Sequence, residues 1–250
     1  MGWEPEDPEN HFQSLRWCSN GDGCAAPVFG KRLRMTETVL VLGNKRYSSW
    51  SLRGYLALKF AGIAFKEEVI PLFQVDTHSR IKAFAEAAPA RVPLLVTGGK
   101  PVWDTLSIME YAAEMSEREL LWPEDRYARA HARSIVAEMH AGFAALRDYI
   151  PMNLSRHDPH TPVPQEVQAD IDRICRIWED CRSAYGEKGP FLFGSLSLAD
   201  AAYAPVVVRF RSRSIPVSPV CQTYMDEVWE LPAFAEWRQD ADKESWVIDQ

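Results

Sequence analysis

The chain has 250 residues, of which 46% are hydrophobic and 25% are charged, a composition typical of globular proteins and not of collagen, coiled coils or wholly disordered chains. The 28 Lys and Arg residues against 35 Asp and Glu give a net charge of -7, so the chain lacks the basic excess of a general nucleic-acid binder. No apolar stretch approaches the ~20 residues that a membrane-spanning helix needs. We therefore expect neither nucleic acid nor a membrane as a partner.

The five cysteines predict a reducing compartment. They form no C-x-x-C pair, and their number is odd; they are Cys18, Cys24, Cys175, Cys181 and Cys221. This pattern argues against a disulfide scaffold and against a zinc ribbon. The N-terminus carries acidic residues and no apolar stretch, unlike a secretory signal. We expect a cytoplasmic protein without a metal site.

Regular hydrophobic patterning of the chain begins at Met35. Residues 1–34 are rich in Pro and Gly and have no sustained hydrophobic period, so we expect a disordered leader there. Strand and helix periods then alternate. The predicted elements are, in chain order, a strand at 38–42, a helix at 49–61, a strand at 65–70, a helix at 77–87, strands at 93–97 and 101–103, and a helix at 105–114. This is the order βαβαββα.

The strand signals end after Leu121. The remaining predicted elements are helices at 125–149, 165–185, 197–211, 219–229 and 232–241, with a proline-rich loop at 151–164. The fold class is therefore α/β plus all-α. We place a small α/β domain at residues 35–117 and an all-helical domain at residues 121–250.

Two serines precede the first predicted helix, in the sequence Tyr47-Ser48-Ser49-Trp50. Free backbone N–H groups and the positive end of the helix dipole stabilise an anion at such a position, and a thiolate is an anion. A hydroxyl that donates a hydrogen bond to sulfur lowers the thiol pKa further. The other reading is a plain N-cap serine with no chemical role.

Two further candidate binding segments are expected at the same edge of the predicted sheet. Val92-Pro93 stands at the start of a strand, where a cis peptide bond would turn the Val92 backbone outward to pair with an extended peptide, although an ordinary strand-start proline also fits. Asp104 and Thr105 begin the last helix of the α/β domain; they favour a carboxylate and an ammonium, or serve only as a cap. Strand ends and helix starts share one edge, where ligands usually bind. Together these groups suit a γ-glutamyl tripeptide thiol.

These residues resemble a cytosolic glutathione S-transferase of a bacterial, zeta-like serine type, from about residue 37 to the C-terminus. The segment Ser-Ser-Trp-Ser-Leu-Arg is similar to the family's S-S-x-S-x-R, and Val92-Pro93 falls where the family has its cis-proline. Asp104-Thr105 falls where the family has Glu/Gln-Ser. Ser197 and Asp200, after Phe-Leu-Phe-Gly, resemble its capping box. The resemblance implies a thioredoxin-like first domain and a helical-bundle second domain.

The resemblance also implies roles for these residues. Ser48 would hold the glutathione thiolate, with Ser49 as the neighbour that substitutes for it. Val92, presented by Pro93 as part of the glutathione site, would pair with the cysteinyl backbone, and Asp104 with Thr105 would bind the γ-glutamyl group. Glutathione is then the co-substrate, a small electrophile is the partner, and a homodimer is expected.

The second substrate is expected beside the long helix that carries His140. His140 either faces the cleft or is an ordinary surface or core histidine. Arg209 lies near the place where zeta members keep an arginine for a carboxylate substrate, or it is a solvated helix end. Trp50 stands where the zeta class has cysteine, which argues against zeta-type isomerase chemistry. No cysteine lies near Ser48, which argues against a reductase of the omega kind.

The leading hypothesis is a glutathione transferase of detoxification, in which a serine hydroxyl activates the thiol for attack on an electrophile. One alternative is a glutathione-dependent cis-trans isomerase of the maleylacetoacetate type. The other is a non-catalytic module that binds glutathione or another ligand, since one fold can carry either activity or binding.

Overall fold

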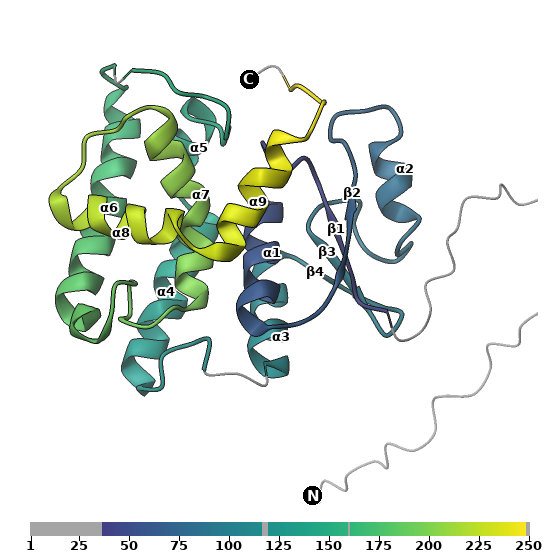
Figure 1. Cartoon of the computed structure of the whole chain (residues 1–250), viewed down its shortest axis with the longest axis horizontal. Helices are drawn as coiled ribbons and strands as arrows, with labels where there is room; N and C mark the ends of the chain where they lie inside the picture. The colour runs from purple at the N-terminus through teal and green to yellow at the C-terminus, as the bar shows by residue number, and fades with distance from the viewer. Residues whose placement is uncertain (1–36, 117–119, 160, 249–250) are drawn as a thin grey trace, which may run out of the picture. The chain divides into compact units, whose positions relative to one another are not determined.

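The first half of the molecule is built on a four-stranded sheet. In the computed structural model the described residues are 37–116, 120–159 and 161–248 (Figure 1), and the predicted leader lies outside them. The strands are β1 (Val39–Leu42), β2 (Lys66–Val69), β3 (Leu94–Thr97) and β4 (Lys100–Trp103), in the spatial order β2-β1-β3-β4. β1 pairs in parallel with β2 and antiparallel with β3, and β3 pairs antiparallel with β4.

Helices cover both faces of this sheet, which explains why β1 is apolar throughout. Its four side chains are fully buried. Leu40 and Leu42 pack on α1 (Ser49–Ala61) and α3 (Thr105–Met115). Val39 and Val41 face the other way and pack in the cluster that includes Ile81 of α2 (Thr77–Lys82). A strand buried on both faces reads as a continuous hydrophobic run, as TVLVL does.

The second half is helical. Its elements are α4 (Arg126–Ala141), α5 (Ala144–Tyr149), α6 (Gln165–Tyr185), the 3₁₀ turn η1 (Gly186–Lys188), α7 (Leu198–Ser212), α8 (Pro219–Trp229) and α9 (Pro232–Asp242). α7 is almost entirely buried and packs against α1, α4 and α8. One hydrophobic cluster runs from β1 and α1 through α7 to α9. The βαβαββα order followed by a helical bundle confirms the predicted fold class.

The start of α7 carries the predicted capping box. The fully buried Asp200 carboxylate accepts hydrogen bonds from the backbone N–H of Ser197 at 2.8 Å and from its hydroxyl at 2.9 Å. It also accepts one from the Leu192 N–H at 3.2 Å, so it ties the preceding loop to the helix. The free N–H groups of a buried helix start need such partners.

Two predicted helices differ from the structure. The helix predicted at 77–87 ends at Lys82, because Phe84 N–H bonds back to Ile81 in a tight turn. The single helix predicted at 125–149 is two helices, since the chain is extended at Gly142 and left-handed at Phe143 (φ 60°). The Phe143 side chain is still buried in the core, so the hydrophobic period continues across the break and conceals it.

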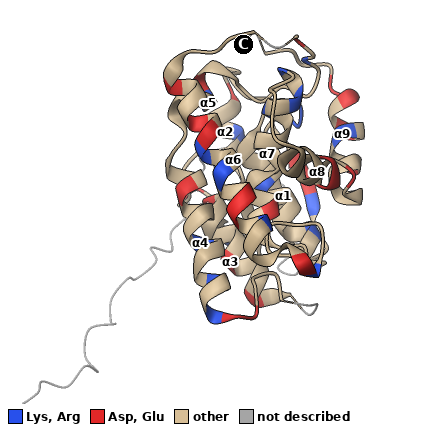
Figure 2. Ribbon diagram, turned by 90° about the vertical axis from the view of Figure 1, so that its left-hand side faces the viewer, with Lys and Arg blue, Asp and Glu red and all other residues tan. Residues whose placement is uncertain are grey.

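Charged residues are interspersed over the exposed helices (Figure 2). Opposite charges meet between neighbouring helices: Arg173 lies 2.7 Å from Glu138, and Arg133 lies 3.0 Å from Glu110. Such exposed pairs contribute little to stability, at most about 1 kcal/mol each. Among the described residues no helix is long and apolar enough to cross a bilayer.

Candidate active site

A cavity of about 450 Å³ lies where the start of α3 and the segment before β3 meet α4. It is lined by Trp50, Pro89, Arg91, Val92, Pro93, Trp103, Asp104, Thr105 and His140. Five of the eight candidate residues, namely Val92, Pro93, Asp104, Thr105 and His140, therefore share one wall. The other three, Ser48, Ser49 and Arg209, are not among the lining residues. The described part of the chain has no group of three His, Cys, Asp or Glu side chains that would suit a metal ion.

Of the two candidate serines, Ser48 is the N-cap of α1 and Ser49 is the first residue of the helix. The Ser48 hydroxyl oxygen accepts the Ser51 backbone N–H at 3.3 Å. The Ser48 hydroxyl donates to Ser51 Oγ at 2.8 Å, and Ser51 Oγ accepts the Gly43 N–H at 2.9 Å. Ser48 and Ser49 are 7% and 8% exposed. Ser48 and Ser49 therefore directly precede Trp50, which lines the cavity.

The Val92–Pro93 peptide bond is cis. Pro93 packs against α1, where a Cβ added at Gly54 would lie 3.0 Å from Pro93 Cγ. Among the hydrogen bonds of the described residues, none uses the Val92 N–H or C=O. A half-buried, unpaired backbone edge at a cavity is a place where an extended peptide can add its own hydrogen bonds.

Asp104 and Thr105 occupy the start of α3, with Asp104 as the N-cap. The Asp104 carboxylate accepts the Leu106 N–H at 2.9 Å, and its backbone adopts a positive φ of 72°. His140 of α4 reaches both residues: its Nδ1 lies 3.3 Å from Thr105 Oγ1, and its Nε2 lies 3.4 Å from Asp104 Oδ2. The histidine therefore faces the cleft, and it links the helical half of the molecule to the start of α3.

Trp50 joins the cavity to Arg53 and Arg147, to which sequence reasoning gave no role. The guanidinium groups of Arg53 and Arg147 lie 4.9 and 4.8 Å from its ring centroid, and the His140 ring meets it edge-on at 5.1 Å. Arg53 also donates to the Ala202 carbonyl of α7 at 2.8 Å. Burial, helped by repulsion from Arg147 and Arg209, lowers the pKa of Arg53 well below its ordinary value.

Arg209 does not reach the cavity wall. It is 6% exposed and donates to the carbonyls of Arg147 and Ile150. Burial and the repulsion from Arg147 lower its pKa to about 10, so it stays charged at neutral pH. Arg53, Arg147 and Arg209, which we call the arginine group, form no ion pair with any carboxylate in the described part of the chain. Asp148 lies near enough to offset part of the positive charge of Arg147 and Arg209. Buried positive charge without a directly paired counter-ion is still costly and favours an anion nearby.

A thioredoxin-like domain followed by a helical domain, with a cavity at the starts of α1 and α3, defines the class of cytosolic glutathione S-transferases. The chain belongs to this family. Residues 47–115 match the glutathione S-transferase N-terminal domain, and residues 124–240 match the C-terminal domain.

Two curated relatives illustrate the likeness in sequence. Protein IN2-1 homolog A of Oryza sativa subsp. japonica is 25% identical over 204 residues, which are 78% of this chain and 78% of the relative. A probable maleylacetoacetate isomerase of Caenorhabditis elegans is 32% identical over 100 residues, 40% of this chain and 45% of the relative.

Solved structures share the fold at lower identity. A glutathione transferase homolog from Burkholderia gl BGR1, solved with bound glutathione, has a TM-score of 0.64 at 19% identity and covers 84% of this chain and 100% of its own. A maleylacetoacetate isomerase from Anaeromyxobacter dehalogenans has a TM-score of 0.58 at 18% identity, with 84% and 92% covered. These likenesses extend over both halves of the molecule.

Proposed function

We propose that the protein is a glutathione transferase that ionises the glutathione thiol beside Ser48 and presents the thiolate to an electrophile. The observation that supports this proposal most directly is the cavity, which is lined by the unpaired Val92 backbone together with Asp104 and Thr105. Relatives with bound glutathione among the solved structures support this choice of ligand.

The cavity is chemically complementary to the tripeptide. Glutathione carries an ammonium group, two carboxylates, an extended cysteinyl backbone and a thiol. Asp104 would accept the ammonium, and the Thr105 hydroxyl with the free N–H groups at the start of α3 would hold the γ-glutamyl carboxylate. Val92 would pair with the cysteinyl backbone, and the exposed Arg91 would meet the glycyl carboxylate.

A chain of hydroxyls would then serve the thiolate. Both serine hydroxyls rotate freely about their C–O bonds. Ser51, which already accepts the Gly43 N–H, can donate to Ser48 Oγ and so release the Ser48 proton toward sulfur. The thiol proton leaves to solvent, the thiolate forms a carbon–sulfur bond with the electrophile, and the leaving group departs with its electron pair. The positive end of α1 adds to the stabilisation.

The test compares Ser48→Ala with Ser49→Ala. We expect Ser48→Ala to lower kcat with a chlorodinitroarene by roughly tenfold to a hundredfold while the Kd for glutathione changes little, because a charge-assisted hydrogen bond contributes about 1.5–3 kcal/mol. Ser49→Ala is the control, since it keeps both the cap and the helix start. Full activity in Ser48→Ala would exclude the serine mechanism.

The arginine group supports a second candidate, a glutathione-dependent isomerase of an unsaturated acid. Arg147 is half-buried and lies against Trp50, so its positive charge acts on the inner side of the cavity wall. There the thiolate would add to the double bond and leave again after rotation, so that glutathione is regenerated. The isomerase among the curated relatives supports this alternative.

The two candidates differ in their response to Arg147→Gln. An isomerase of acids should lose affinity for a cis-dienoyl diketoacid, seen as a raised KM, while conjugation of the neutral chlorodinitroarene continues unchanged. Equal effects on both substrates would assign Arg147 to the structure of α4 and α5 alone.

A further inference from the structure

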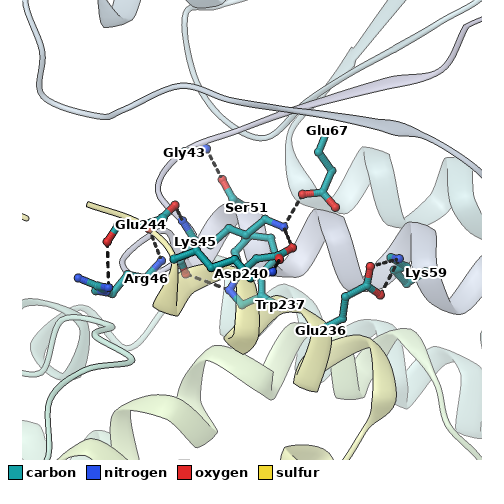
Figure 3. Close-up of polar contacts among 11 residues, drawn as sticks. Gly43, Lys45, Arg46, Ser51, Lys59, Glu67, Glu236, Trp237, Asp240 and Glu244 are labelled. Atoms are coloured by element: carbon teal, nitrogen blue, oxygen red, sulfur yellow. Dashed lines mark hydrogen bonds and ion pairs between the residues drawn. The ribbon is translucent and has the colours of Figure 1, made fainter. Parts of the chain in front are cut away.

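The loop that precedes Ser48 is bound by α9 and by the residues that directly follow this helix. The Trp237 ring N–H of α9 donates to the Lys45 carbonyl at 2.9 Å (Figure 3). The Glu244 carboxylate, just past α9, accepts the backbone N–H of Lys45 at 2.6 Å through one oxygen and that of Arg46 at 3.0 Å through the other. We call Trp237, Asp240 and Glu244 the C-terminal clamp.

The side chains of the same loop complete the clamp. Lys45 is 5% exposed; its Nζ lies 2.7 Å from Asp240 and 2.5 Å from Glu67, and it stands over the rings of Tyr55 and Trp237. Arg46 donates to the carbonyls of Ala241 and Glu244 at 3.0 and 3.1 Å. A cation at the carbonyl end of a helix is favourable for the helix dipole.

A single turn of backbone connects the clamp to Ser48. The N–H groups of Tyr47 and Ser48 both bond to the Asn44 carbonyl, at 3.1 and 2.8 Å. Residues 45 and 46, which the clamp holds, therefore lie inside the turn that sets the position of Ser48. We expect a shift of the backbone of residues 45 and 46 to shift Ser48 as well, because the two hydrogen bonds to the Asn44 carbonyl span these residues.

We propose that Glu244 is a positioning residue that holds the residue 44–48 turn and thereby the Ser48 hydroxyl in register with the bound thiol. This inference rests on the proposed function, since it assigns a part to a residue far from the cavity. The two neighbouring N–H groups bonded to one carboxylate carry it: that arrangement fixes a loop geometry, which a surface ion pair does not.

The experiment compares Glu244→Ala with Glu236→Ala. Glu236 lies within α9, whereas Glu244 lies just past it, and Glu236 reaches α1, where it pairs with Lys59 at 2.8 Å in the last turn, at the opposite end of α1 from Ser48. Each variant removes one carboxylate that joins the C-terminal segment to the first domain, through backbone hydrogen bonds for Glu244 and through an ion pair for Glu236. We expect Glu244→Ala to raise the thiol pKa of bound glutathione and to lower kcat roughly tenfold with little change in KM, since misplacement by about 1 Å costs up to about a hundredfold. Glu236→Ala should leave both values unchanged.

Amide hydrogen exchange of residues 44–48 supplies a readout that needs no glutathione. Faster exchange there in Glu244→Ala, together with the raised thiol pKa, supports the inference. Unchanged exchange, or faster exchange with an unaltered thiol pKa, overturns it. If the wild-type protein itself fails to lower the thiol pKa, the proposed function fails, and the exchange data still decide whether Glu244 holds the turn. Glu244→Gln, which keeps one acceptor oxygen, should fall between wild type and Glu244→Ala.

Discussion

Replacing Ser51 separates the structural part of the hydroxyl chain from its chemical part. Ser51 is fully buried, accepts the Gly43 N–H at 2.9 Å and is bonded to the Ser48 hydroxyl at 2.8 Å. In Ser51→Ala the Gly43 N–H loses its partner inside the protein. An unpaired buried N–H costs about 1–3 kcal/mol, and loss of the second bond about 1 kcal/mol. We expect a fall of roughly 2–4 kcal/mol in the free energy of unfolding.

The chemical effect of the same change should be small. Hydrogen bonds in a chain strengthen one another by roughly 10–30%, which on a bond of about 1.5–3 kcal/mol between Ser48 and sulfur is below about 1 kcal/mol. The thiol pKa of bound glutathione should therefore rise by well under one pKa unit in Ser51→Ala. Ser48→Ala, which removes the whole bond, should raise it by about one to two pKa units.

The assays are denaturant unfolding, a thermal melt and an absorbance titration of the bound thiolate. For a chain of this size, 2–4 kcal/mol corresponds to a drop in Tm of roughly 4–16 °C. Ser49→Ala serves as the control, since Ser49 has no part in the hydroxyl chain. If Ser51→Ala raised the thiol pKa more than Ser48→Ala, then Ser48 would not be the residue that touches sulfur and the order of the chain would be wrong.

Three other predictions concern Gly54 and Asp104 near the cavity and Asp200 in the capping box of α7. Gly54→Ala should destabilise the protein by about 1–3 kcal/mol in urea titration, because the new Cβ would lie 3.0 Å from Pro93; an unchanged midpoint would mean that the proline segment yields freely. Asp104→Asn keeps the cap of α3 but loses the charge, so KM for glutathione should rise roughly tenfold while Tm stays constant, and a fall in kcat alone would contradict the assignment. Burial raises the pKa of Asp200 from 3.8 to about 6, so the folded chain binds more protons than the unfolded chain between about pH 4 and pH 6. Its contribution to the free energy of unfolding should therefore fall with rising pH in that window, by up to about 3 kcal/mol, and Asp200→Asn should abolish this slope; a wild-type slope of the opposite sign would show that its hydrogen bonds outweigh burial.

The element order and much of the cavity wall could be predicted from local signals. The Ser48 cap, the Asp104 start of α3 and the Ser197–Asp200 box each depend on residues within one turn of the chain, which sequence patterns report directly. His140 could only be offered as a candidate, because its contacts with Asp104 and Thr105 join residues 35 or more positions apart. The homodimer, the cytoplasmic location and the domain boundaries stay predictions.

The clamp had no local signal at all. Glu244 follows the last helix, and nothing in its neighbours indicates that its carboxylate binds the backbone of residues 45 and 46, near the opposite end of the described chain. Backbone N–H groups carry no residue-specific signature, so a side chain that binds them is invisible to pattern reasoning. The contacts that we propose to position Ser48 therefore lie beyond the reach of sequence patterns, whereas the serine pair itself could be named as a candidate from its place before a helix.

The wrong prediction of one long helix and the missed role of Arg147 have the same physical origin. In a continuous helix the carbonyls of Met139 and His140 would be taken by N–H groups four residues further on. The break at Gly142 and Phe143 leaves them to the Arg147 guanidinium, which donates to Met139 and His140 and to Gly142 at 3.0 Å. Held there, Arg147 lies 4.8 Å from the Trp50 ring. A single left-handed residue therefore sets the charge beside the cavity, and restoring the helix at Phe143 would remove that charge from the site without touching any residue of its wall.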